Sequence, residues 1–246
     1  MFSFAPKLPI NEQTRVWIDE GFVRLSAMLG RGRMLQAEVV LPEDSFFPDA
    51  FHPSQEGAVL MARRIAGYMG VPEDSFVVEV FTETAHATRR LLPLWEGQSR
   101  GAGGLYFHEV EDGKRVIAIN AENLKQPDAL AATLAHELAH VVLLGGNLLD
   151  RETEDMEPMT DLCTVFLGLG VLNANAAVQF RQWSNNQTQG WSTKTAGYLE
   201  QEMWGYALAL FAKERGEGVA PAWRQALSTD VKDYFTRSAK WLARQK

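Results

Sequence analysis

Residues 130–140 read Leu-Ala-Ala-Thr-Leu-Ala-His-Glu-Leu-Ala-His, and this segment says most about the architecture of the chain. Leucine recurs every four residues from Leu130, which places the leucines on one face of a helix. Pro127 suits the first turn of that helix, and Gly145 followed by Gly146 is a natural end for it. The pattern predicts a buried, apolar helix of about five turns.

Two histidines and a glutamate interrupt this apolar helix. His136 and His140 lie one turn apart, so their imidazoles project from the same face. Two imidazoles placed in this way can bind one Zn²⁺ ion at about 2.0–2.1 Å. Glu137 stands beside the first histidine, where it can accept a proton from a metal-bound water without binding the metal. Burying three polar groups without a metal or other partners is costly, so a metal site is favoured over histidines that are satisfied by core carbonyls.

A catalytic zinc site needs a third protein ligand. No histidine follows His140 in the chain, so we expect a carboxylate from residues 150–161. Glu157 and Asp161 stand out because they share one face of a helix that begins near Pro158. One of the two can bind the metal while the other accepts the free ring N–H of a histidine ligand.

Residues 115–170 resemble the gluzincin zinc metallopeptidases, which combine a His-Glu-x-x-His helix with a Glu-x-x-x-Asp pair on a following helix. The resemblance implies a zincin-like core, one Zn²⁺ per chain, and hydrolysis of a peptide or protein substrate. It implies three metal ligands, His136, His140 and Glu157. It also implies that Glu137 is the general base and that Asp161 orients His136, with Asp161 as the alternative third ligand.

Peptide hydrolysis also needs a hydrogen-bond donor to the oxyanion that develops on the substrate carbonyl. In gluzincins this donor is often a tyrosine or histidine from the helical region after the zinc site. That resemblance makes Tyr198 and Tyr206 candidates, and each is also explained as a core or interface tyrosine with a satisfied hydroxyl. His108 is a weaker candidate. Cys163 is expected to be a buried, inert thiol rather than a ligand.

The fold class predicted by the whole chain is α+β, with a small sheet and the metal-binding helix leading into a mostly helical C-terminal half. We expect one domain over residues 1–246. Its possible subdivisions are residues 1–95, an N-terminal α/β portion; residues 96–180, the zinc-site core; and residues 181–246, a helical C-terminal portion.

Local signals predict the individual elements. Helices are expected at residues 11–29, after Ser54 and at 231–242. Strands are expected at 35–41, at 76–82 and, as a hairpin around Asp112-Gly113, at 105–110 and 115–120. Residues 183–197 are expected to form a long exposed loop.

Composition excludes several classes of protein. The chain has 246 residues, and its 24 Lys and Arg against 31 Asp and Glu give a formal net charge of −7, the wrong sign for a nucleic-acid binder. A single cysteine rules out an internal disulfide and a zinc site made of thiolates. The first ten residues do not form a secretory signal, so we expect a cytoplasmic protein without a membrane partner.

Two alternatives to a peptidase stay open at this point. The zinc could serve a structural, regulatory or non-peptidase site. The helical half could instead be a metal-free interaction module. The sequence does not indicate the substrate, whether activity is latent, or the oligomeric state.

Overall fold

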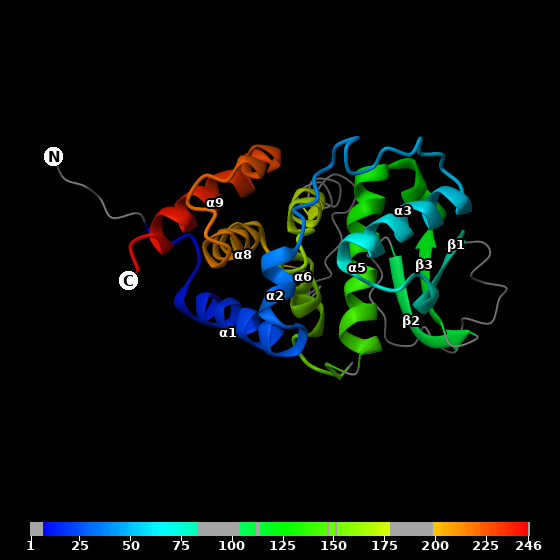
Figure 1. The fold of residues 1–246 in the computed structure, drawn as a ribbon, viewed down its shortest axis with the longest axis horizontal. Coiled ribbons are helices and arrows are strands. Elements are labelled where there is room, and N and C mark those ends of the chain that lie inside the picture. Colours follow the sequence, from blue (N-terminus) through cyan, green and yellow to red (C-terminus); the bar gives the residue numbers. More distant parts are fainter. Residues whose placement is uncertain are drawn as a thin grey trace, which may run out of the picture. The chain divides into compact units, whose positions relative to one another are not determined.

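The computed structural model describes residues 7–82, 104–111, 114–146, 148–150, 152–177 and 199–245 (Figure 1). The fold is α+β and mostly helical, as predicted. Two compact units divide the chain: a helical unit of Met1–Pro42 with Glu152–Lys246, and a sheet unit of Glu43–Arg151. These units do not follow the subdivisions suggested at residues 95 and 180. Helix α1, from the start of the chain, packs against α6 and α8 and so belongs with the C-terminal helices.

The sheet unit contains a three-stranded sheet in the order β1-β3-β2. Its strands are β1 (Phe76–Phe81), β2 (Gly104–Glu111) and β3 (Lys114–Asn120). The β2–β3 pair is antiparallel, as the predicted hairpin requires, whereas β1 runs parallel to β3. All four residues from Val116 to Ile119 are buried, which is the pattern of a central strand covered on both faces.

Helix α3 (Gln55–Met69) begins where predicted, because the Ser54 hydroxyl accepts a hydrogen bond from the Gly57 N–H. It ends at Gly70, whose φ of 64° lies in the left-handed region that glycine adopts readily. The Gln55 side chain reaches β1, where its amide nitrogen donates to the Val78 carbonyl (2.5 Å) and its amide oxygen accepts from the Val80 N–H (2.8 Å). Helix α3 therefore packs against both β1 and α5.

Helix α5 (Pro127–Gly145) is the predicted apolar helix, and it packs against α3, β2 and β3 (Figure 1). Its bounds match the proline and glycine signals. Among the described residues it alone is long and apolar enough to cross a membrane by length and composition, but 83% of the relevant window is buried inside the protein. That burial is what the core position of α5 requires.

Short 3-10 helices, η1 (Glu73–Ser75) and η3 (Ala121–Lys125), flank β1 and β3.

The helical unit consists of α1 (Glu12–Leu29), α2 (Arg31–Gln36), α6 (Met156–Phe166), a helical segment at residues 170–177, α8 (Gln201–Glu214), η4 (Ala222–Ala226) and α9 (Thr229–Leu242). Helix α9 is the predicted amphipathic C-terminal helix, and it packs closely on α8. Gly205 permits this approach, because a Cβ atom at that position would lie 2.4 Å from the Cβ of Tyr234.

The strand predicted at residues 35–41 is wrong. Helix α2 occupies the first part of this range, and residues 37–41 have no regular secondary structure. The Val40 N–H donates to the carbonyl of Gly168 at 3.0 Å, in the turn after α6. Val40 is fully buried. The alternation of residue types therefore reflects an extended segment packed on helices rather than a strand in a sheet. The loop predicted at 183–197 lies outside the described residues.

Candidate metal centre

Helix α5 carries the two predicted histidine ligands on one face. The ring centroids of His136 and His140 are 4.8 Å apart, with 82° between the ring planes. Both side chains are buried, at 6% and 5% exposure. The α-helical spacing alone explains this arrangement, because residues four apart are neighbours on a helix surface.

Glu137 lies on the same helix and is also buried, at 3% exposure. It is adjacent in sequence to His136 and precedes Leu138, which is also buried. Helix α5 itself contains no lysine or arginine. The role of Glu137 as general base stays a prediction.

Glu157 is the second residue of α6, in the first helical turn. His136 and His140 belong to the sheet unit and offer two imidazole nitrogens, whereas Glu157 belongs to the helical unit and offers a carboxylate. Two imidazole nitrogens and one carboxylate oxygen are ligands that zinc accepts.

Asp161, the alternative third ligand, lies in the middle of α6. It is 2% exposed, and its Oδ2 atom accepts a hydrogen bond of 3.0 Å from the Leu199 N–H. This hydrogen bond joins the middle of α6 to Leu199, which lies just before α8. The suggested orientation of His136 by Asp161 stays a prediction.

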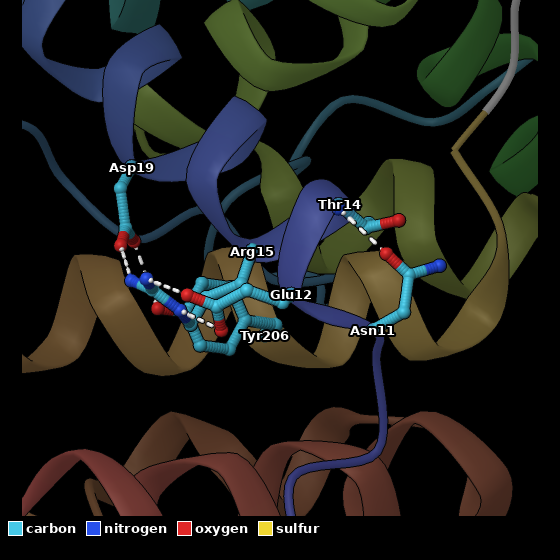
Figure 2. Close-up of polar contacts among 6 residues, drawn as sticks. All are labelled: Asn11, Glu12, Thr14, Arg15, Asp19 and Tyr206. Carbon is cyan, nitrogen blue, oxygen red and sulfur yellow. Dashed lines mark hydrogen bonds and ion pairs between the residues drawn. The ribbon is translucent and has the colours of Figure 1, made fainter.

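Tyr206, one of the two oxyanion candidates, is fully buried in the helical unit. Its hydroxyl donates to Oδ1 of Asp19 at 2.8 Å, and Figure 2 shows this hydroxyl close to the Arg15–Asp19 ion pair. Burial, with the Asp19 hydrogen bond second, raises the pKa of this phenol above its ordinary value. This geometry is that of a packed tyrosine with a satisfied hydroxyl. Tyr198 and the side chain of His108 lie outside the described residues.

Cys163 is a buried thiol, as expected. Its side chain is fully buried on α6, and burial raises its pKa to about 12. Leu162, Val165 and Phe166 of the same helix are also fully buried. The thiol is therefore part of the packing of the helical unit.

Sequence reasoning missed a polar cluster in the helical unit. Arg15 Nη2 donates to Glu12 at 2.6 Å, its Nε donates to the other Glu12 oxygen at 3.0 Å, and its Nη1 pairs with Asp19 (Figure 2). Spacings of three and four residues along one helix are the signal that could have revealed it. The fourth member, Tyr206, joins from a distant part of the chain and leaves no such signal.

No known protein family, curated protein or solved structure matches this chain.

Proposed function

We propose that this protein is a zinc-dependent peptidase of the gluzincin type. The observation that carries the proposal is the buried pair His136 and His140 on one face of α5. Glu157, in the first turn of α6, is the proposed third ligand. In this proposal the sheet, α3 and α5 form a zincin-like core. Zinc is the proposed metal because two neutral nitrogens and one carboxylate leave a fourth tetrahedral position for a water molecule.

A zinc ion bound by these ligands would supply two kinds of chemistry: it would lower the pKa of a water molecule and polarise the carbonyl of the scissile peptide. The residues of the chain do the rest. His136 and His140 would bind the cation through imidazole nitrogens, and Glu157 would contribute a negative charge that partly offsets that of the cation. The burial of all three α5 groups limits competing water and strengthens their electrostatic interactions.

Glu137 would act as the general base. It is buried and adjacent in sequence to the proposed ligand His136, which supports a role as proton acceptor. Its carboxylate would take a proton as the water oxygen attacks the carbonyl carbon. The same proton would then pass to the amide nitrogen as the C–N bond breaks, so that the products are a carboxylate and an amine.

The substrate class is part of the proposal. We propose peptides or proteins as substrates and a cytoplasmic location, with neither nucleic acid nor membrane as partner. The formal charge of −7 supports the exclusion of nucleic acid, because phosphate backbones attract basic surfaces.

Metal analysis and hydrolysis together test the proposal. The purified chain should hold about one zinc per molecule and cleave members of a quenched fluorescent peptide library, and a zinc chelator should abolish cleavage. Glu137→Gln should keep the zinc and lose at least about 100-fold in kcat/KM, the usual contribution of a general base. His140→Ala should lose the zinc. Glu154→Gln is the matched control, because it removes an exposed carboxylate three residues before Glu157.

Each other outcome points to one of the alternatives. A chain that holds zinc but cleaves no peptide would favour a structural or regulatory metal site. A well-folded chain without zinc, unaffected by chelator, would end the metal proposal. Equal activity of Glu137→Gln and the parent chain would remove Glu137 from the mechanism while leaving the metal in place.

A further inference from the structure

The helical unit contains an open cavity of about 720 Å³. Its walls come from α1, α2, α8 and α9, and none of the candidate metal ligands lines it. This volume falls within the range of about 300–1,000 Å³ that is typical of small-molecule sites. The cavity is therefore large enough for a ligand of several residues or of comparable size.

The middle of the cavity is apolar. Its lining includes Phe22 from α1, Met34 from α2, Leu210 from α8, and Trp241 and Leu242 from α9. These side chains come from four different helices, so they surround the space rather than covering one side of it. A ligand that fills the middle would bury apolar groups of its own.

One end of the cavity has an excess of negative charge. Of the described residues that line this end, Arg15 is the only cation, and it is shared by two carboxylates, those of Glu12 and Asp19 (Figure 2). Tyr206 donates to Asp19, and the Arg15 guanidinium lies 5.9 Å from the centre of the Trp241 ring. These contacts fix the positions of the charged groups before any ligand arrives.

The other end has an excess of positive charge. Arg31 is paired with Glu214 at 3.1 Å, so these two charges offset each other. Lys213 adds a second cation to this end. Its ammonium group makes no ion pair or hydrogen bond with the part of the chain that the structure describes.

Helix α8 sets the separation between the two ends. Tyr206, which binds Asp19, and Lys213 are seven positions apart on it and both line the cavity. At about 1.5 Å per residue this separation is about 10 Å. An extended tripeptide also spans about 10 Å, at about 3.3–3.6 Å per residue.

We propose that this cavity binds short apolar peptides with free termini, about three residues long. The peptide's ammonium group lies near Glu12 and Asp19, its apolar side chains fill the middle, and its carboxylate pairs with Lys213. The proposal does not rest on the proposed hydrolysis, because neither Glu137 nor any proposed metal ligand lines the cavity. In a peptidase, such a site would retain small products or sense their concentration.

Isothermal titration with Leu-Leu-Leu tests this proposal. The titration uses the Glu137→Gln chain and, separately, the chelated parent chain, since hydrolysis is absent from both under the proposed function. We expect one peptide per chain. Leu-Leu-Leu amide and N-acetyl-Leu-Leu-Leu should each bind about fivefold to tenfold more weakly, as the loss of one partly exposed charge pair predicts. Triglycine should bind at least about tenfold more weakly, because it buries no apolar side chain.

A variant of the positive end gives the decisive comparison. Lys213→Gln should weaken Leu-Leu-Leu about as much as amidation does, and it should leave the affinity of the amide unchanged. Lys125→Gln, an exposed lysine outside the cavity, is the control and should change neither affinity. Equal affinity for Leu-Leu-Leu and its amide, or weakening of both by Lys213→Gln, would overturn the assigned orientation. Absence of binding at millimolar peptide would overturn the site, whatever the hydrolysis assays show.

Discussion

Helix α5 and the helix pair α1–α8 both carry polar side chains among apolar neighbours, but they differ in the source of positive charge. Between α1 and α8, Arg15 provides the cation that Glu12 and Asp19 require, and Tyr206 completes the set. Helix α5 has His136, Glu137 and His140 but no lysine or arginine of its own. The first cluster contains its own cation, Arg15. The second consists of the side-chain types that bind a metal cation.

Of the changes considered below, removal of the metal should change the free energy of unfolding most. If free zinc is about a thousandfold above its Kd, a chelator should lower the free energy of unfolding by about 4 kcal/mol, because the metal binds only the native state. Chemical unfolding at fixed zinc concentration, with and without chelator, measures this difference. His140→Ala should show no response to chelator. A response of equal size in His140→Ala would place the metal elsewhere.

The helical unit that contains this cluster depends on close packing of α8 against α9, which Gly205→Ala tests. The added methyl would meet the Cβ of Tyr234 and the backbone of Phe235, so we expect a loss of about 3 kcal/mol in unfolding free energy. Gly67→Ala is the control, since no atom lies within 4 Å of its added methyl and α3 should gain up to about 1 kcal/mol. A Gly205→Ala chain as stable as the parent would contradict the close α8–α9 contact.

Tyr206→Phe separates packing from catalysis. Removing the hydroxyl leaves Asp19 with one hydrogen bond fewer, and we expect a loss of about 1 kcal/mol in stability with no change in kcat/KM. Tyr68→Phe removes a comparable hydrogen bond, to the Phe46 carbonyl, and should cost a similar amount. A 100-fold fall in kcat with unchanged stability would instead make Tyr206 the oxyanion donor.

The smallest expected effect is at Cys163, whose thiol should not react with a thiol reagent at pH 8 until the protein unfolds. Burial raises its pKa from the ordinary 9.0 to about 12 in the native state. The unfolded state therefore loses the proton first, and stability should fall as the pH rises above 9. Cys163→Ala should show a smaller fall between pH 8 and pH 10. Rapid labelling of the native chain would contradict the burial.

The sequence predicted those parts of the site that arise from local spacing. The leucine repeat placed α5, and the four-residue interval placed His136 beside His140 without knowledge of any other element. Glu157 required only the absence of a later histidine and a helix start near Pro158. The placement of α5 and of the histidine pair uses residues within a few turns of one helix, whereas the choice of Glu157 also used the rest of the chain.

Pairings between distant residues could not be predicted in this way. The hydrogen bond from Tyr206 to Asp19 joins residues 187 positions apart, and the parallel pairing of β1 with β3 leaves no local pattern. At residues 35–41 a strand was predicted where the structure has none. Apolar residues that alternate with polar ones are compatible with an extended segment whether or not a partner strand lies beside it. Val40 is buried against a helix turn, and only tertiary packing distinguishes the two cases.

Gln55 gives the sheet unit a property unrelated to catalysis. A primary amide has a carbonyl oxygen and N–H groups, as a peptide group does. The Gln55 side chain therefore makes the two hydrogen bonds, to Val78 and Val80, that one residue of an additional strand would make. Among the strands that the structure describes, β1 is an outer one, and unpaired outer strands are templates for aggregation. A second molecule cannot add its own strand here while the first turn of α3 stays in place. The beginning of a helix thus protects this edge of the sheet from self-association.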